Sequence, residues 1–485
     1  MKNIALGILS ILVVLVAIMT VNTIRHTPPS LTGVTQTKIE IEKDKVAGHL
    51  AEAIRFRTVS NQSKTKNDRS QFTGFIDWVA TTYPAITNRL DLQRANYSLL
   101  YKWQGTDPSL KPILVTAHYD VVPVLPGTEN KWSADPFGGE IIDGIIWGRG
   151  ALDDKSGVIA ILEAVTYLLD SGYQPARTIY LSFGHDEEVG GTEGAAAIVA
   201  LLQEQGVQLL WSLDEGSFVF KDMFPGVKNL IATINVAEKG SVTLDIVASA
   251  PGGHSSMPPT ETAIGKLAGA ITLLENNPVP GGLDGMGKDL FDNMSAYMDF
   301  GPRMLFANQW LFKSLVEQQL SSVTFANAMM RTTTAPTMLS GSVKTNVLPI
   351  EAIATVNFRI HPRDTIESVT QYVEDLVGSE DIEVRFRGGI NASSVSDWQS
   401  PGFANIALAS REIYGEVVIT PGLMIAGSDS RHYGKIADNA FRYNPFIVTP
   451  ADLTGFHGTN ERISIDNLAQ GVRTYVQIIR HGGEQ

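Results

Sequence analysis

The sequence predicts an α/β protein with a mostly parallel, helix-covered sheet and a separate α+β domain inserted into it. From Ile39 to about Ile234, short apolar runs alternate with helical patterns, which is typical of parallel strands connected by helices. From Val236 the pattern changes to strands of alternating polarity, which is typical of a sheet with one solvated face. At 485 residues, the chain also exceeds the length that one hydrophobic core usually serves.

The main domain is predicted to comprise residues 39–235 and 389–485. Residues 112–117 (PILVTA) form a continuous apolar run, and this indicates a buried strand. Residues 155–169 predict a helix, because their apolar side chains recur at three- and four-residue steps. Residues 177–183 predict the next strand.

The inserted domain is predicted to comprise residues 236–388. Alternating apolar and polar residues at 242–248 and 352–358 predict two half-exposed strands. A helix is expected after Asp364, which would be its N-cap, with Glu367 completing a capping box. Residues 381–387 predict one more strand.

The first 24 residues carry a membrane signal. The uncharged stretch Ile4–Val21 is rich in Leu, Ile and Val and approaches the roughly 20 residues that a spanning helix needs. Residues 17–23 offer only Thr and Asn where signal cleavage needs small residues, so we expect an uncleaved anchor. Lys2 then favours a folded body outside the cytoplasm, and a secreted or periplasmic protein after cleavage is the alternative. Residues 25–38 have the composition of a tether.

Composition narrows the function classes. The formal net charge of -13 argues against nucleic acid as a partner, because phosphate binding needs clustered Lys and Arg. The chain has no cysteine, which excludes disulfides, thiolate metal sites and cysteine nucleophiles. Any metal ion must therefore be held by His, Asp and Glu.

Polar clusters follow the apolar strands of the main domain, where open α/β sheets bind ligands. His118 and Asp120 close the first strand, and their spacing places both side chains on one side. His185–Gly191 (HDEEVGG) puts three adjacent carboxylates after the next strand. Adjacent carboxylates repel one another unless a cation compensates or solvent reaches them all. A metal site accounts for the cluster, and a solvated acidic loop is the alternative.

Three more segments carry similar residues. Gly148–Lys155 (GRGALDDK) places two carboxylates between a Gly-rich turn and a helix start, where a simple N-cap is the alternative. It lacks the third glycine of a dinucleotide fingerprint, so we discard that interpretation. Asp214–Gly216 (DEG) again follows apolar residues, and His457 lies among glycines that allow close backbone approach.

Together these segments resemble the sequence blocks of the M20 family of metallopeptidases, particularly its carboxypeptidase S and N-acyl-amino-acid hydrolase branch. The blocks match in order from residue 118 to residue 458, and Gly252–Pro259 and Thr345–Val347 match within the inserted domain. The resemblance implies a zinc-exopeptidase-like catalytic domain. It also implies that the inserted domain is a dimerisation lid, and therefore that the protein is a homodimer.

The resemblance also implies the roles of the site residues. It assigns His118, Asp153 and Asp214 to one zinc ion, and Asp153, Glu188 and His457 to a second. Asp120 would support His118, and Glu187 would be the general base. Two ions about 3.5–4 Å apart polarise a carbonyl and lower the pKa of a water molecule. Cobalt or manganese would also accept these ligands.

In the lid, the resemblance implies that His254 reaches into the partner subunit's site and helps to bind the developing oxyanion, assisted by Asn346. Arg359 resembles the family's arginine for the substrate carboxylate, although Asn357 stands where the family usually has Asp. Gly427–Tyr433 (GSDSRHY) resembles a further block, from which Ser428 and the preceding Ala426 depart, and we expect it at the substrate pocket.

The predicted function is a two-zinc hydrolase that cleaves an amide or peptide bond beside an amino acid with a free carboxylate, as a carboxypeptidase does. The alternative is an aminoacylase acting on N-fatty-acyl amino acids. Apolar residues at 304–315 could line its acyl site, although a core or a dimer interface would also explain them. A catalytically inactive, membrane-tethered binding protein is a remote alternative, because no ligand or base is missing. A serine hydrolase has no G-x-S-x-G motif here to support it.

Overall fold

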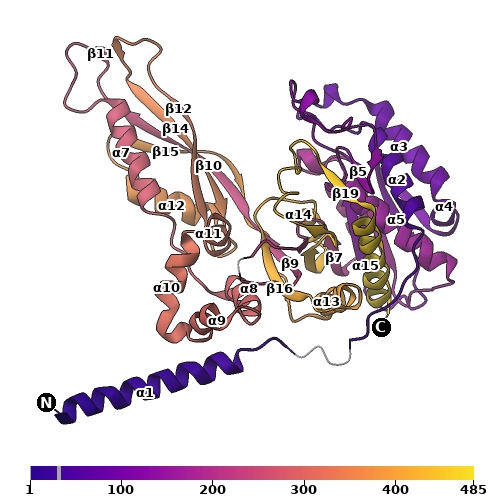
Figure 1. The fold of residues 1–485 in the computed structure, drawn as a ribbon. Coiled ribbons are helices and arrows are strands. Elements are labelled where there is room, and N and C mark those ends of the chain that lie inside the picture. The colour runs from indigo at the N-terminus through magenta and orange to yellow at the C-terminus, as the bar shows by residue number, and fades with distance from the viewer. Residues whose placement is uncertain (1, 30–33, 225, 485) are drawn as a thin grey trace.

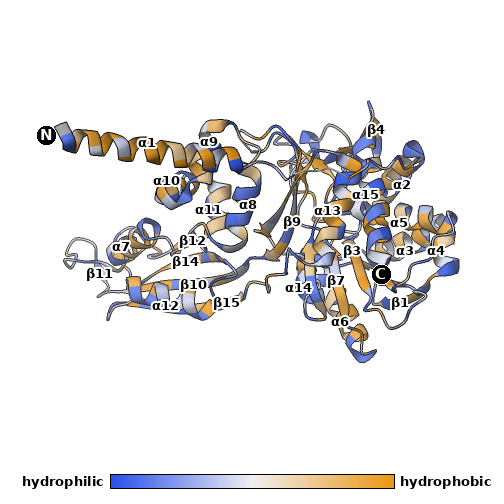
Figure 2. Ribbon diagram, turned by 90° about the horizontal axis from the view of Figure 1, so that it is seen from below, coloured by the Kyte–Doolittle hydropathy of each residue, from blue (hydrophilic) through white to orange (hydrophobic). Residues whose placement is uncertain are grey.

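The computed structural model describes residues 2–29, 34–224 and 226–484. Two lobes form the body of the protein, and a long N-terminal helix, α1 (Lys2–Arg25), extends past them (Figure 1). Figure 2 shows that α1 is apolar along most of its length. Of the predicted tether, residues 30–33 lie outside the described residues.

The larger lobe contains a ten-stranded sheet in the described part of the chain, with the order β1-β2-β6-β3-β7-β17-β9-β8-β18 and β16 beside β9. The central strands β6, β3, β7 and β17 pair in parallel, whereas β1, β2 and β6 pair antiparallel. The mostly parallel sheet predicted from the sequence is therefore confirmed. The strands are β1 (Asp91–Ala95), β2 (Ser98–Trp103), β3 (Ile113–His118), β6 (Ile179–Gly184), β7 (Leu209–Asp214), β8 (Val219–Phe220), β9 (Ile231–Glu238), β16 (Val418–Met424), β17 (Ala437–Arg442) and β18 (Ile447–Val448).

Helices cover both faces of this sheet. Leu114 and Val115 are adjacent in β3 but belong to different hydrophobic cores, because successive strand side chains point to opposite faces. The helices of this lobe are α2 (Lys43–Arg55), α3 (Arg69–Thr82), α4 (Pro84–Arg89), α5 (Lys155–Asp170), α6 (Ala195–Glu204), α13 (Pro401–Tyr414), α14 (Ser430–Tyr433) and α15 (Ile465–Gly483), with 3-10 turns η1 (Lys64–Lys66), η2 (Glu129–Lys131) and η3 (Glu187–Val189). A small separate sheet contains β4 (Glu140–Ile142), β5 (Ile145–Trp147) and β19 (Arg462–Ser464).

The smaller lobe, which we call the lid, has its own antiparallel sheet in the order β12-β14-β10-β15. Its strands are β10 (Gly240–Ser249), β12 (Thr333–Ser340), β14 (Glu351–Ile360) and β15 (Ile382–Ile390), and a short ribbon pairs β11 (Gly253–His254) with β13 (Val347–Leu348). Helices α7 (Ala263–Asn276) and α12 (Ile366–Val377) pack on it around a second core. The boundaries predicted at 236 and 388 fall within β9 and β15.

The predicted N-cap of α12 is wrong by one residue. Thr365 is the N-cap and forms a capping box with Ser368, in place of Asp364 and Glu367. Asp364 instead accepts a hydrogen bond from Thr332 Oγ1 at 2.5 Å. The Asp364 carboxylate therefore binds a residue distant in the sequence, Thr332, and does not cap the helix.

Four helices lie within the lid sequence but outside its sheet, and the first of them packs against β16 of the larger lobe (Figure 1). They are α8 (Gly285–Ser295), α9 (Phe300–Ala307), α10 (Gln309–Ser321) and α11 (Thr324–Met330). Leu290, Phe291 and Met330 of this helical insertion are buried in the same core as the main sheet, not in the core of the lid. The insertion therefore shares its buried apolar residues with the core of the larger lobe.

Candidate metal centre

The predicted metal-binding residues meet where the carboxyl ends of three neighbouring strands, β6, β3 and β7, form one edge of the sheet. His118 is the last residue of β3, and it lies opposite Gly184, the last residue of β6. Glu187 and Glu188 begin η3 directly after β6. Parallel pairing therefore brings residues about 70 positions apart into contact, as expected for a ligand site of an open α/β sheet.

Asp153 lies at the centre of the cluster, in the loop between β5 and α5. Its Oδ1 lies 3.1 Å from His118 Nε2, and its Oδ2 lies 3.2 Å from His457 Nε2. His457 Nε2 is also 3.2 Å from Glu188 Oε2. Although burial acts in the opposite direction, hydrogen bonds from the two histidines hold the pKa of Asp153 below its ordinary value. The two oxygens of one carboxylate thus face two separate histidines, as a bridging ligand requires.

Asp120 is fully buried and supports both halves of the cluster. His118 Nδ1 lies 3.0 Å from the backbone oxygen of Asp120 and 3.4 Å from its carboxylate Oδ1. The same carboxylate accepts hydrogen bonds from the backbone N–H groups of Glu187 and Glu188, each at 3.2 Å. Asp120 therefore orients His118 with Nε2 toward Asp153 and fixes the turn that carries two of the acidic residues.

The third carboxylate near His118 belongs to Glu215 and not to Asp214. Glu215 Oε1 lies 3.4 Å from His118 Nε2. His118, Asp154 and Glu215 each have one metal-ligand atom within 4.8 Å of the others. Asp214 ends β7, and its Oδ1 accepts a hydrogen bond from the backbone N–H of Glu215 at 2.9 Å. Adjacent residues at a strand end point in different directions. The carboxylates of Asp214 and Glu215 therefore cannot both face His118 in the same way. The geometry favours Glu215 over the predicted ligand Asp214.

Glu187 lies beside the cluster, with Oε2 at 4.0 Å from His118 Nε2. Burial raises the pKa of Glu187 well above its ordinary value; Glu215 and Asp429 raise it further, and His118 opposes them. A carboxylate with a raised pKa is suited to accept and return a proton near neutral pH. This position is compatible with the predicted role of general base.

A glycine keeps the acidic turn in place. Gly191 has φ +63°, and a Cβ there would lie within van der Waals distance of the buried Asp429 carboxylate, at 1.9 Å from Oδ1. At 1.9 Å the two atoms would overlap, so any side chain at this position would displace Asp429. This contact accounts for the last glycine of the HDEEVGG segment and places part of Gly427–Tyr433 behind the acidic turn.

Sequence analysis missed Glu461, which is fully buried behind the Asp153 loop. Its Oε1 accepts hydrogen bonds from the backbone N–H groups of Gly150, Leu152 and Asp153, at 3.0, 2.8 and 3.0 Å. Its Oε2 accepts one from Arg149 Nη1 at 2.7 Å. Glu461 lies four residues after His457 in a polar segment, and nothing in that segment indicates burial.

The donor set fits metal ions of the type the sequence predicts. Within the part of the chain that the structure describes, Glu188 Oε1, Asp154 Oδ2 and Asp214 Oδ2 are buried carboxylate oxygens without a hydrogen-bond partner. His118, Asp153 and Glu188 have one ligand atom each within 4.8 Å of one another. Buried carboxylates that converge without donors are costly unless a cation compensates their charge. Imidazole and carboxylate ligands are suitable for zinc and also for cobalt or manganese.

The remaining predicted site residues lie away from this cluster within one chain. His254 is exposed on β11, at the outer tip of the lid (Figure 1), and its Nδ1 contacts Ser256 Oγ at 2.7 Å. Asn346 lies beside it, where its backbone oxygen accepts from Ser255 N. Arg359 is exposed on β14 at the base of the lid sheet, opposite Ser241. One chain alone does not bring these residues to the metal centre.

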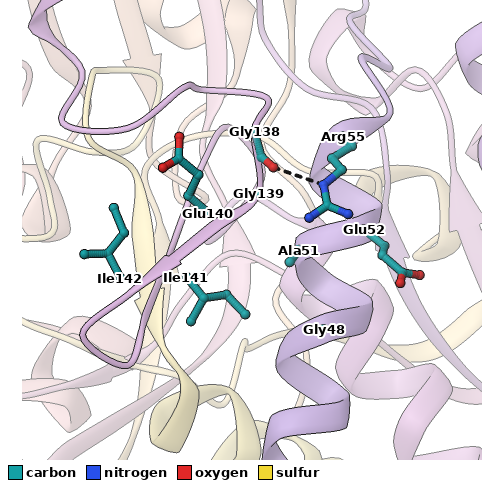
Figure 3. A pocket seen from close by; sticks show the side chains of 9 residues that line it. All are labelled: Gly48, Ala51, Glu52, Arg55, Gly138, Gly139, Glu140, Ile141 and Ile142. Carbon is teal, nitrogen blue, oxygen red and sulfur yellow. Dashed lines mark hydrogen bonds between the residues drawn. The ribbon is translucent and has the colours of Figure 1, made fainter.

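A surface depression elsewhere on the larger lobe contains none of the predicted site residues. It lies between α2 and the segment Gly138–Ile142, and Arg55 Nε donates to Gly138 O at 3.1 Å across it (Figure 3). Its lining has neither a histidine nor a group of converging carboxylates. We therefore assign it no part in the reaction.

The fold and the cluster of histidines and carboxylates define a metal-dependent hydrolase. Residues 114–481 match the model of peptidase family M20/M25/M40, and the chain belongs to this family. It is accordingly an M20-type peptidase or amidohydrolase, as predicted.

Known proteins of two kinds are similar to this chain. The N-fatty-acyl-amino acid synthase/hydrolase PM20D1.1 of Danio rerio is 41% identical over 390 residues, which cover 80% of this chain and 75% of that protein. The probable carboxypeptidase S-like 2 of Dictyostelium discoideum is 37% identical over 498 residues, covering 99% and 93%. Among solved structures, an M20 family metallo-carboxypeptidase from Sulfolobus solfataricus has a TM-score of 0.63 at 17% identity and covers 92% of this chain and 100% of its own. That structure supports the predicted fold.

Proposed function

We propose that this protein uses two divalent metal ions, zinc in the first instance, to hydrolyse the amide bond of N-acyl amino acids. The single observation that carries the proposal is the placement of Asp153, whose two oxygens lie 3.1 and 3.2 Å from His118 and His457. His118 and Glu215 complete one side, and Glu188 and His457 the other. Metal ions bound there would supply Lewis-acid polarisation of the scissile carbonyl and a lowered pKa of water.

The chain's own residues perform the proton transfers. Glu187 takes a proton from the attacking water and returns it to the nitrogen of the leaving amino acid. Asp120 keeps His118 and the Glu187 backbone in register through the hydrogen bonds described above. The buried surroundings of Glu187 raise its pKa, which makes its carboxylate a stronger base toward the attacking water.

Long-chain N-acyl amino acids are the favoured substrate class. The relative from Danio rerio and the PM20D1 protein of Xenopus tropicalis, 37% identical over 91% of this chain, are both named N-fatty-acyl-amino acid synthase/hydrolase. A carboxypeptidase activity on short peptides is the second candidate, supported by the carboxypeptidase S-like relative. In both, Arg359 would bind the free carboxylate of the amino acid.

A homodimer would complete the site. His254 and Asn346 lie together at the exposed tip of the lid, where a second copy could receive them. In this arrangement His254 of one subunit would donate to the developing oxyanion in the site of the other. Co-expression of His254→Ala and Glu187→Gln chains tests this, because mixed dimers would regain one intact site and partial activity.

The N-terminal helix is proposed to be a retained anchor. Residues Asn3–Arg25 are long and apolar enough to cross a membrane, a property that a signal peptide near the N-terminus shares. An anchor would hold the catalytic lobe outside the cytoplasm and close to substrates that partition into lipid. Loss of the segment from the mature protein would make it secreted or periplasmic instead.

The substrate proposal is tested with the full-length protein in detergent, loaded with zinc and offered oleoyl-phenylalanine and a dipeptide. We expect faster hydrolysis of the acyl amino acid and loss of activity after chelation. Preference for the dipeptide would select the second candidate. No hydrolysis of either substrate by zinc-loaded protein would contradict the proposed function.

A further inference from the structure

The C-terminal end of α1 is built into the folded body through one buried side chain, Asn308. Asn308 lies between α9 and α10 and is inaccessible to solvent, as is Thr23 of α1. Asn308 Nδ2 lies 3.2 Å from the Met19 carbonyl oxygen and 3.4 Å from Thr23 Oγ1, and its Oδ1 accepts from Asn22 Nδ2 at 3.0 Å. Asn308 Nδ2 also lies 2.9 Å from the Met304 carbonyl oxygen of α9, so this one buried amide joins α1 to α9.

A second contact follows immediately after α1. His26 Nε2 lies 2.9 Å from Ser295 Oγ of α8. The hydrogen bonds that join this end of α1 to the body come from polar side chains, while most of α1 is apolar and exposed. A helix of this kind has two environments, lipid along its length and protein at its end.

If α1 spans a bilayer, the position of these contacts along α1 determines how deep α9 and α10 lie in the membrane. A 23-residue helix rises about 34 Å, slightly more than the roughly 30 Å of a bilayer's hydrocarbon core. Residues 19–26, which contact Asn308 and Ser295, thus fall at the membrane–water interface. In both views α9 and α10 lie beside this end of α1 (Figures 1 and 2).

The two helices are poorly covered by the rest of the protein. No residue of α9 is buried, and Val316 is the one buried residue of α10. Four large apolar side chains are exposed here: Phe300 (48%), Trp310 (57%), Leu311 (49%) and Leu315 (43%). Leu311 and Leu315 lie one turn apart on the same face of α10. Trp310 Nε1 donates to Asn308 Oδ1 at 3.2 Å, which holds the indole near α1.

We propose that these four residues, the apolar patch of α9 and α10, lie in the interfacial layer of a phospholipid bilayer next to the end of α1. Tryptophan and long apolar side chains at this depth are typical of segments that lie within a membrane surface. The bilayer is favoured over other occupants because α9 packs against the candidate membrane span α1, and Trp310 is hydrogen-bonded to the asparagine that contacts it. This inference rests on the anchor proposed above. It assigns the helical insertion a function that neither the metal centre nor the lid sheet requires.

The absence of cysteine from the sequence allows a site-specific test. A Leu311→Cys variant of the full-length protein is labelled with an environment-sensitive fluorophore and reconstituted into phosphatidylcholine–phosphatidylglycerol vesicles. The vesicles carry a nitroxide quencher at a shallow position of the acyl chain. Leu273→Cys on α7 is the matched control, because Leu273 has a similar exposure (47%) and α7 lies away from α1 in both views (Figures 1 and 2).

We expect the nitroxide lipid to quench the probe at 311 at least threefold more than the probe at 273. Leu315→Cys provides a second reporter of the same face if the first variant folds poorly. Equal quenching at 311, 315 and 273 would overturn the proposal. Quenching that depends on protein concentration, but not on the nitroxide lipid, would instead show that a second copy covers the patch.

Two measurements on the same samples separate this proposal from those on which it depends. Mass spectrometry of the membrane-extracted chain reports whether α1 is retained, and a mass lacking residues 1–25 would refute both the anchor and the apolar patch. Hydrolysis of oleoyl-phenylalanine in detergent reports the proposed activity independently of the membrane. An active, intact protein whose probe at 311 is not quenched would contradict the membrane contact alone.

Discussion

The hydrogen bonds of Glu461 lead to a quantitative prediction for Glu461→Gln. The glutamine amide keeps one acceptor oxygen for the three N–H groups of the Asp153 loop. Its NH₂ group, however, would face the Arg149 guanidinium, which now lies 2.7 Å from a carboxylate oxygen. Both side chains are buried, Arg149 at 2% and Glu461 at 0% exposure, so water cannot replace the lost acceptor.

The expected cost follows from this burial. Breaking a buried ion pair by removing one charge costs about 3–5 kcal/mol. Hydrogen bonds to a charged group are worth about 1.5–3 kcal/mol each, and the three backbone bonds weaken when the acceptor becomes neutral. We expect Glu461→Gln to lower the free energy of unfolding by about 3–5 kcal/mol. Zinc affinity should also fall, because Asp153 belongs to the clamped loop.

The measurement is urea unfolding of the full-length protein in detergent, monitored by tryptophan fluorescence, together with zinc content. Glu383→Gln is the matched control, since it removes the same charge from an ion pair with Arg385 on the exposed face of the lid, at 2.8 Å. Surface pairs of this kind contribute little, and we expect no measurable loss. Equal stability and zinc content in the two variants would refute the role of Glu461 in holding the Asp153 loop.

The remaining predictions concern the metal centre. Glu187→Gln should lower kcat by 10²–10⁴-fold or more while zinc content stays at the wild-type level; loss of zinc would show instead that Glu187 is a ligand. Asp120→Asn should weaken zinc binding by about 10–100-fold, as measured by competition with a chelator, and unchanged affinity would contradict its support of His118. Glu215→Gln should impair zinc binding more than Asp214→Asn, and the reverse order would restore Asp214 as the ligand. After chelation, thermal stability should fall as the pH rises from about 5 to 7; above pH 7, Lys155 and Lys239, whose pKa values burial lowers to about 7, lose their protons in the folded protein and oppose this trend. Burial raises the pKa of Glu215 to about 8, and hydrogen bonds that His457 donates to Asp153 and Glu188 raise the pKa of His457 to about 10, so these two groups bind more protons in the folded apoprotein than in the unfolded chain. Bound zinc should remove this slope.

Much of the fold was predictable because its signals are local. Continuous apolar runs gave the buried central strands, and alternating polarity gave the lid strands, whose side chains meet solvent on one face. The packing of α8 against β16 of the larger lobe was not predictable in this way. An apolar helix face shows that a helix is buried somewhere, but it does not distinguish the core of the lid from that of the main sheet.

The metal centre was predictable to the level of segments but not always of atoms. His118, Asp153 and His457 were assigned from the family blocks, and the structure brings them within hydrogen-bonding distance. In the Asp214–Glu215 pair, however, two adjacent acids compete for one position. The direction of each side chain depends on where β7 ends, and that is set by its pairing with β17. A match to a sequence block cannot resolve this choice.

The acidic residues of the centre have two different functions. Those that accept hydrogen bonds from backbone N–H groups hold loops, and those with an unpartnered oxygen are available to a metal ion. Asp186 accepts the N–H groups of Glu193 and Gly194 at 2.8 and 2.9 Å, as Asp120 does for the acidic turn and Glu461 for the Asp153 loop. These carboxylates bind backbone donors and hold loops. Glu188 instead has a buried oxygen without a donor among the described residues, and such an oxygen is free for a cation. Chelation should therefore leave the loops clamped, whereas neutralising a clamp should disturb the loops even when metal is abundant.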